Sequence, residues 1–281
     1  MIPRSDTLPA WTDHDHHSKV QPLRETSAGQ VEPYLQSFLD QESRRLHRRR
    51  QQVRVLDFGC GRGDRVAWLC EQGWDAWGVD IAERYLAQGR SHFEQHGFGP
   101  DRTRLIEDGR QLPFEEASFD LVLSDHVIEH VEDLDECVDG LRRVLRPGAS
   151  GLHVYPPRWH PVEPHMHTPL THWIPKGVSR RAAIHASLRM GLGVNYFEDL
   201  PLDERTDIFA RYSDNETFYR SESSLRRTFG RYGMSCDFRS PSEAKLRIRR
   251  TWIPGPLLPA AAVLYRTFVS TYLHTRLDPG T

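Results

Sequence analysis

A short apolar strand that ends in an acid and enters a glycine turn constrains this chain more than any other feature of its sequence. The predicted strand, Val53–Phe58, leads into Gly59, Gly61 and Gly63, and a helical pattern begins directly after them. Glycines at alternate positions let backbone amides approach a ligand where a Cβ would block it. A dinucleotide-binding turn would read G-x-G-x-x-G, but Asp64 occupies the last glycine position. The acid two positions before the first glycine, Asp57, suits a cationic amino-acid ligand better than a pyrophosphate.

Strand and helix patterns alternate along the chain after this turn. Short apolar segments predict four more strands, and a helix over 134–145 is expected to stop at Arg146-Pro147-Gly148-Ala149. Such alternation predicts an α/β fold with a doubly wound, mainly parallel sheet. Ligands of these sheets bind outside the carboxyl ends of the strands. The four further strands are predicted at 75–80, 104–106, 118–124 and 151–155.

Acidic residues follow two of these strands, where a ligand is expected. Asp80 comes 17 positions after Gly63, near the ~20-residue offset at which an acid meets a ribose diol in nucleotide-binding sheets. Asp108 and Gly109 follow the third strand. Each feature alone has a structural interpretation, Asp80 as a turn or cap residue and the Asp-Gly pair as a turn. Their common order and spacing favour a ligand site.

In this order the motifs resemble those of the class I S-adenosylmethionine-dependent methyltransferases, over about residues 50–157. The likeness is closest to the branch related to quinone-biosynthesis methyltransferases, in which an Asp-Leu-Val strand precedes a Glu-His pair, here Glu129-His130. The resemblance implies a Rossmann-like sheet of seven strands and S-adenosylmethionine as the cofactor. We expect an inserted loop or lid after the fifth strand.

The resemblance also implies cofactor roles for the matched residues. The glycine turn would pass against the methionine part, and the acid before it would lie near the ammonium group. The acid ending the second strand would take the ribose hydroxyls, the Asp-Gly pair would meet the adenine edge, and residues 124–126 would line the cleft near the sulfonium. The predicted cofactor-binding residues are Asp57, Gly59, Gly61, Gly63, Asp80, Ile81, Asp108, Gly109 and Ser124.

Bulk properties limit the class of protein. The chain has 281 residues, of which 38% are hydrophobic and 27% charged, as in soluble globular domains. A net charge of −2 argues against a nucleic-acid partner. Four scattered cysteines match no disulfide or zinc pattern and predict reduced thiols in a cytoplasmic protein. Basic runs at 44–54 and 245–250 predict solvated faces or, alternatively, a surface for an anionic membrane or substrate carrier.

Residues 156–175 are rich in proline, histidine and tryptophan, so they can form neither a regular helix nor a central strand. Long ordered loops beside strand ends are usually functional. The Glu163-Pro164-His165 core resembles a segment of some bacterial methyltransferases that would line the acceptor pocket; a purely structural loop is the alternative. Histidine and carboxylate ligands suit a divalent metal, but the spacing matches no familiar site, so we expect none. The loop histidines are His160, His165, His167 and His172.

Five segments organise the chain. We expect a disordered segment at 1–30 without a signal peptide, a cofactor-binding core at 31–157, an acceptor-side loop and helical insertion at 158–215, the end of the core sheet at 216–251, and an apolar tail at 252–281. Within these, we expect helices over 180–190 and 221–232 and an antiparallel pair of strands over 234–239 and 244–250.

The apolar tail contains an uninterrupted stretch, 260–273, that is too short for a bilayer span of ~20 residues. It fits a helix packed on the core or on a partner subunit, which would make a homodimer. Alternatively, it lies in a membrane interface, at the inner face of the membrane.

Histidines near the strand ends are the candidates for catalysis. A hydroxyl acceptor must lose its proton near the transition state, and a neutral imidazole is suited to take it. The candidate bases are His126, His165 and His130, although His130 could instead orient the following helix. This favours O-methylation of a small-molecule, glycan or lipid-linked acceptor over N-methylation of a small amine. A non-catalytic cofactor-binding module and another S-adenosylmethionine reaction stay open.

Overall fold

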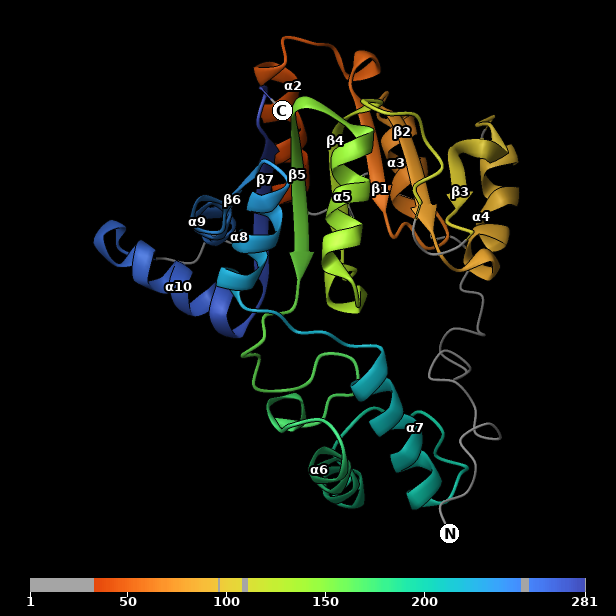
Figure 1. The fold of residues 1–281 in the computed structure, drawn as a ribbon, viewed down its shortest axis with the longest axis vertical. Helices are drawn as coiled ribbons and strands as arrows, with labels where there is room; N and C mark the ends of the chain where they lie inside the picture. Colours follow the sequence, from red (N-terminus) through yellow and green to blue (C-terminus); the bar gives the residue numbers. More distant parts are fainter. Residues whose placement is uncertain (1–32, 96, 108–110, 249–252, 281) are drawn as a thin grey trace.

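The protein, seen in a computed structural model that describes residues 33–95, 97–107, 111–248 and 253–280, is built on a seven-stranded sheet (Figure 1). The strand order is β3-β2-β1-β4-β5-β7-β6. The first five strands pair in parallel, and β7 runs antiparallel to both of its neighbours. The expected α/β fold with a doubly wound sheet is therefore confirmed. The strands are β1 Arg54–Phe58, β2 Asp75–Asp80, β3 Thr103–Leu105, β4 Phe119–Asp125, β5 Leu145–Tyr155, β6 Met234–Asp237 and β7 Thr271–Leu277.

Helices cover both faces of the sheet. One face packs against α5 (Leu134–Val144) and α8 (Glu222–Arg231). The opposite face packs against α2 (Pro33–Arg45), α3 (Asp64–Glu71), α9 (Arg239–Ile248) and α10 (Leu258–Phe268). The remaining described helix of the core, α4 (Glu83–Gln95), lies beside β3 at the sheet edge (Figure 1).

The period-2 pattern of the strands explains this three-layer arrangement. In β1, Leu56 and Phe58 face the first layer of helices, whereas Val55 faces the second. In β7, Leu273 faces the first layer and Tyr272 faces the second. Because alternate side chains of a strand point to opposite faces, strands that are apolar throughout must be covered on both sides.

A helical insertion lies beyond the carboxyl ends of the strands (Figure 1). It follows β5 and contains α6 (Val178–Arg189) and α7 (Leu202–Asn215), which pack against each other. The insertion has its own apolar core, which is separate from the two cores of the sheet. That core consists of Met166, Ile184, Leu188, Ile208, Phe209, Ala210 and Tyr212. The expected insertion after the fifth strand is thus present, and its first helix starts two residues earlier than predicted.

The start of the fifth strand differs from the prediction. Arg146-Pro147-Gly148-Ala149 does not separate a helix from a strand, because β5 already begins at Leu145. Pairing with β4 shifts register between Phe119 and Leu121, which accommodates the residues that could not continue a regular ladder. Arg146 Nη1 also lies 2.7 Å from Asp120 Oδ2, which fixes the start of the strand.

The predicted second strand of the final pair is wrong. Residues 244–248 belong to α9, and residues 249 and 250 lie outside the described residues. Asp237 Oδ1 accepts hydrogen bonds from the backbone amides of Arg239 (2.8 Å) and Ser240 (3.1 Å), and this cap starts a helix where an extended chain was expected.

The partner of β6 is β7, which the predicted apolar tail supplies. The core sheet therefore continues past residue 251, and the last segment includes an internal strand rather than a detachable tail. The predicted disordered segment at 1–30 lies outside the described residues.

Helix α10 is amphipathic in its packing. Leu258, Ala262 and Tyr265 are buried against the sheet, whereas Val263 and Leu264 are exposed. In the described part of the chain, no helix has the length and apolar character needed to cross a membrane. The expected contact of this segment with a membrane surface or a second copy stays a prediction for the exposed face.

Two histidines within the sheet predict acid sensitivity. His153 is fully buried, with Nδ1 2.8 Å from Ser124 Oγ and Nε2 3.2 Å from Thr275 Oγ1. Burial lowers the pKa of His153 to about 3 and that of His274 to about 4. The unfolded chain therefore binds protons that the folded state does not, below the unfolded pKa of ~6.5. Their stabilising contribution is complete above that pH and is lost as the pH falls toward the folded values.

We expect the free energy of unfolding in urea to fall by about 2 kcal/mol or more between pH 7.5 and pH 4.5 through His153 alone. The glutamine of His153→Gln does not titrate. In this variant the free energy of unfolding should be lower at pH 7.5, but it should fall less between pH 7.5 and pH 4.5. An identical pH slope in the variant would show that His153 is not a source of the acid sensitivity.

Candidate functional site

The glycine turn after β1 is held in place by backbone contacts with β2. The amides of Gly59 and Cys60 both donate to the carbonyl oxygen of Val79, at 2.9 Å. The amide of Gly61 donates to Asp80 Oδ2 at 2.8 Å, while Asp80 Oδ1 accepts from the amide of Ala82 at 2.9 Å. Asp80 therefore braces the turn with one carboxylate oxygen and the following chain with the other.

Two glycines of the turn have different surroundings, although both have positive φ (+55° at Gly61 and +83° at Gly63). A Cβ on Gly63 would lie under 3.0 Å from Phe93 and Thr103. A Cβ on Gly61 would meet no atom of the described structure within 4 Å. Gly63 is thus required by packing, whereas Gly61 faces open space, as a turn that cradles a ligand must.

The acid at the end of β1 is engaged by an arginine that sequence reasoning missed. Arg65, on α3, places Nη1 2.9 Å from Asp57 Oδ1 and Nη2 2.8 Å from Asp125 Oδ2. It therefore joins the carboxyl ends of β1 and β4. Asp57 is buried, and burial raises its pKa although the charge of Arg65 opposes the shift. Any group that approaches Asp57 meets an acid already paired with Arg65.

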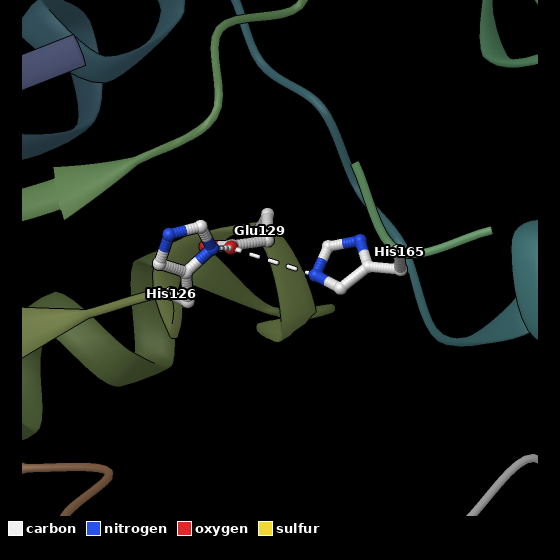
Figure 2. Close-up of side chains that lie close together, drawn as sticks. All are labelled: His126, Glu129 and His165. Atoms are coloured by element: carbon white, nitrogen blue, oxygen red, sulfur yellow. Dashed lines mark ion pairs between the residues drawn. The ribbon is translucent and has the colours of Figure 1, made fainter. Parts of the chain in front are cut away.

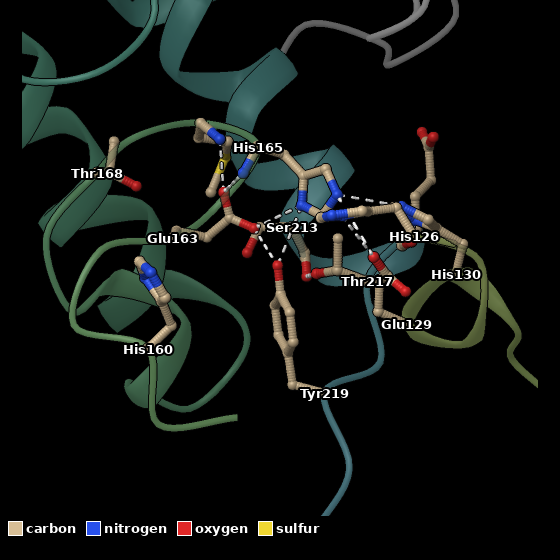
Figure 3. Close-up of polar contacts among 12 residues, drawn as sticks. His126, Glu129, His130, His160, Glu163, His165, Thr168, Ser213, Thr217 and Tyr219 are labelled. Atoms are coloured by element: carbon tan, nitrogen blue, oxygen red, sulfur yellow. Dashed lines mark hydrogen bonds and ion pairs between the residues drawn. The ribbon is translucent and has the colours of Figure 1, made fainter. Parts of the chain in front are cut away.

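Three histidines and a buried glutamate meet beyond the carboxyl end of β4 (Figures 2 and 3). His126 follows β4 directly and has φ +55°, a strained conformation for a non-glycine residue. Its Nδ1 lies 3.3 Å from Glu129 Oε1, and His165 Nε2 lies 3.9 Å from the same atom. His130 Nε2 lies 3.2 Å from His165 Nε2. The structure therefore brings the three candidate bases together, although they come from two distant segments.

His165 is oriented by the loop that follows β5. Its Nδ1 lies 3.1 Å from Glu163 Oε1 and 3.1 Å from the hydroxyl of Tyr219, which also donates to Glu163 (Figure 3). The other oxygen of Glu163 accepts the backbone amides of His165 and Met166, at 2.8 and 2.5 Å. These contacts turn the Nε2 edge of His165 toward Glu129.

The charges of the cluster shift the pKa values of its members. Contact with the Glu129 carboxylate raises the pKa of His126, whereas burial lowers that of His130. Burial acts to raise the pKa of Glu163, but the hydrogen bond and charge of His165 outweigh it, and the net pKa is lowered. Burial, followed by the charge of Glu163, raises the pKa of Tyr219. Glu163 is therefore ionised and Tyr219 neutral near pH 7.

The chain returning from the insertion fixes the 3₁₀ turn Ile128–His130 that carries the cluster. The amide of Phe218 donates to the carbonyl of Glu129 at 2.6 Å, and His130 Nδ1 lies 2.7 Å from the carbonyl oxygen of Glu216. Arg220 donates to the carbonyl oxygens of Ile128, Val131 and Glu132.

Other predicted residues lie elsewhere. The Ser124 hydroxyl is buried inside the sheet and bonded to His153, which corrects the expectation that its side chain lines a cleft. Ile81 is strongly exposed beside Asp80. The predicted Asp108-Gly109 pair lies outside the described residues.

The remaining loop histidines do not join the cluster. His160 Nδ1 contacts the backbone of Val162, His167 is exposed, and His172 is buried against Tyr219, with its pKa lowered to about 4 by burial. Among the other residues of the cluster, the sequence pointed to Glu129 only through the Glu-His pair that it forms with His130. No sequence pattern pointed to Tyr219.

Residues 56–152 match the model of a family described as a methyltransferase domain. This stretch is therefore similar to a methyltransferase domain, and the strand order of the sheet agrees with the resemblance drawn from the sequence. The match covers the turn after β1, the acid of β2 and the Glu129-His130 pair, which are the motifs that carry the resemblance in the sequence.

Relatives agree with this domain. The chain is 31% identical over 147 residues to a ubiquinone biosynthesis O-methyltransferase of Acinetobacter baumannii, covering 50% of this chain and 54% of that protein. It is 30% identical over 101 residues to the sterol 4-C-methyltransferase strm-1 of Caenorhabditis elegans, covering 36% and 30%. The chain thus spans about half the length, or less, of these curated relatives.

One solved structure has a similar fold. A Galdieria sulphuraria protein assigned as a sarcosine dimethylglycine methyltransferase has a TM-score of 0.51 and 16% identity, covering 92% of this chain and 91% of that one. At this identity the likeness concerns the fold alone.

The two glycines give a test of the turn. Gly63→Ala should lower the free energy of unfolding by about 3 kcal/mol, because a left-handed alanine is strained and its Cβ meets Phe93 and Thr103. Gly61→Ala carries only the conformational strain, about 1 kcal/mol. Urea unfolding of both variants measures the difference. Equal losses would mean that Gly63 is not confined by its neighbours.

Proposed function

We propose that the protein is an S-adenosylmethionine-dependent methyltransferase that methylates a hydroxyl group of a small-molecule, glycan or lipid-linked acceptor. The observation that carries this proposal is that the glycine turn after β1 and the histidine cluster after β4 lie at the carboxyl ends of parallel strands of one sheet. The match of residues 56–152 to a methyltransferase domain supports the cofactor, and the ubiquinone O-methyltransferase relatives support an oxygen nucleophile.

The turn residues fit the cofactor. Gly61 leaves open space where a side chain would project, and the Asp80 carboxylate stands beside it. We assign the methionine part to the turn at Gly59, Gly61 and Gly63, the ribose hydroxyls to Asp80, and a neighbouring apolar contact to exposed Ile81. Arg65 keeps Asp57 in place for the amino-acid end of the ligand.

The acceptor would bind at the histidine cluster. When bound, S-adenosylmethionine supplies an electrophilic methyl group on a sulfonium, so the protein has mainly to position a nucleophile, a contribution of up to ~7–11 kcal/mol in favourable intramolecular cases. A hydroxyl must also lose its proton, and imidazole nitrogens of His165 and His130 face the cluster. Exposed His126 leaves one side of the cluster accessible from solvent.

We favour an oxygen acceptor over a nitrogen acceptor because of the imidazole nitrogens of His165 and His130. A neutral amine can attack the methyl group without a base to remove its proton first. A non-catalytic cofactor-binding module is the candidate from another class. It predicts cofactor binding without methylated product, and the sheltered Glu163–His165–Tyr219 arrangement favours catalysis over it.

The cofactor proposal is tested by calorimetric titration with S-adenosylmethionine and S-adenosylhomocysteine. We expect micromolar binding of both. Asp80→Ala should weaken binding at least about tenfold, since the loss of one good ribose contact costs ~1.4 kcal/mol or more. Asp203→Ala, an exposed acid of α7, is the matched control. Thermal unfolding reports whether Asp80→Ala keeps the fold. Absence of binding by the unaltered chain would overturn the proposal.

The acceptor side is tested separately with hydroxylated glycans, phenols and polyketides, with methyl transfer followed by mass spectrometry. His165→Ala should reduce kcat at least about a hundredfold while leaving the affinity for S-adenosylhomocysteine unchanged. Loss of cofactor affinity in this variant would mean that the loop serves the cofactor rather than the acceptor.

A further inference from the structure

The Glu129 carboxylate is an unusual feature of the cluster. Its side chain is 1% exposed, and among the described residues neither carboxylate oxygen accepts a hydrogen bond with acceptable geometry. Its nearest polar neighbours are His126 Nδ1 at 3.3 Å and His165 Nε2 at 3.9 Å (Figure 2). A buried carboxylate without a hydrogen bond is costly, so the site requires a compensating positive charge.

Two ring nitrogens of the cluster, on His130 and His165, carry lone pairs in the neutral rings. His130 Nδ1 contacts a carbonyl oxygen, which can only accept, so Nδ1 holds the hydrogen and Nε2 is bare in the neutral ring. His165 Nδ1 contacts the Glu163 carboxylate, so the same reasoning leaves its Nε2 bare. Yet these two Nε2 atoms lie only 3.2 Å apart (Figure 3). Two lone pairs at this distance repel unless a cation or an extra proton lies near them.

We propose that His126, Glu129 and His165 bind one divalent metal ion of the zinc type. One ligand atom from each residue lies within 4.8 Å of the others. Tetrahedral ligands at zinc bond lengths of ~2.0 Å stand ~3.3 Å apart, so a small contraction of the cluster closes the site. Two imidazoles and one carboxylate match the ligand set of catalytic zinc sites that keep a position open, and they suit magnesium poorly because it prefers oxygen.

The surroundings support such a site. Metal-bound histidines usually donate their second ring nitrogen to a carboxylate or carbonyl, which raises the basicity of the ligating nitrogen. Glu163 takes this role for His165, and Tyr219 holds Glu163 in turn. The exposed position of His126 lets ions enter from solvent and leaves the open position accessible.

The role of the ion rests on the proposed function. An acceptor hydroxyl at the open position would have its pKa lowered by the ion. Its proton would leave to solvent. The hydroxyl oxygen forms a bond to the methyl carbon, the carbon–sulfur bond breaks, and its electron pair stays on sulfur. The products are the methyl ether, the neutral thioether and one proton.

The test is metal binding by the full chain after treatment with a chelator. Zinc is added back in known amounts, and the zinc bound per chain is measured by mass spectrometry after desalting. In a parallel sample Co²⁺ is added instead, and the visible absorption spectrum of the bound Co²⁺ is recorded. We expect one ion more than in Glu129→Gln, together with a tetrahedral Co²⁺ spectrum that this variant lacks. The affinity should fall at least about a hundredfold in Glu129→Gln and in His165→Asn. His167→Asn, an exposed histidine of the same loop, is the matched control and should bind normally.

Comparison with the variants is needed because His14, His16 and His17 provide another zinc-binding sequence. Equal zinc content and equal Co²⁺ spectra in the unaltered chain and in Glu129→Gln would overturn the proposal, and the close nitrogens would then share an extra proton. Near-ultraviolet circular dichroism confirms the fold of each variant, and His165→Asn gives a second reading if Glu129→Gln unfolds.

The affinity for S-adenosylhomocysteine, measured on the same samples, separates the two proposals. Cofactor binding without a metal ion would contradict the metal site and leave the proposed function standing. A bound metal ion in a chain that does not bind S-adenosylhomocysteine would support the metal site and contradict the proposed function.

Discussion

One guanidinium holds the proposed acceptor site together. Arg220 donates to three carbonyl oxygens of residues 128–132, at the turn where the histidine cluster begins. Within the turn, the carbonyl oxygen of Ile128 also accepts from the amide of Val131 at 3.4 Å, and Arg220 adds a charged donor to this carbonyl and to those of Val131 and Glu132. Because Arg220 lies where the chain returns from the insertion, the same contacts fix the insertion over the end of β4. In the proposed function, this arrangement places the acceptor beside the cofactor.

The site combines a strained backbone with buried carboxylates. His126 has a left-handed backbone, and Glu129 and Glu163 are both buried beside His165. Either feature alone would destabilise an ordinary loop, and both persist because the neighbouring elements fix them. In contrast, the two apolar cores of the sheet follow the strand pattern without exception in β1 and β7.

The first strands of the sheet and the glycine turn could be predicted from the sequence because their signals are local. The strand–turn–helix at residues 53–69, the second strand at 75–80 and the order of acids each depend on neighbours in the chain. The final strands could not be predicted in this way. A local cap at Asp237 turned the expected strand into α9, and β6 pairs with a strand more than thirty residues further on. Pairing at that separation leaves no periodic signal near β6.

The candidate site divides along the same line. His126, His130 and His165 could be predicted by residue type, since histidines near strand ends are suited to proton transfer. Their arrangement could not, because it depends on Tyr219 and Arg220, which approach from beyond the insertion. The side chain of Ser124 was expected near the ligand, but the alternation of side chains along β4 turns it into the sheet toward His153. No metal site was predicted in the loop, because the spacing of its histidines matches no familiar pattern; the proposed site instead combines His126, Glu129 and His165, which are distant in the sequence.

The most direct test of the central claim is a crystal structure of the full chain grown with S-adenosylhomocysteine. We predict density for the ligand along the turn at Gly59, Gly61 and Gly63, with its ribose at Asp80 and its sulfur facing the cluster of His126, Glu129 and His165. Ligand bound elsewhere, or with its sulfur turned away from that cluster, would contradict the claim that the two edges form one methyl-transfer site.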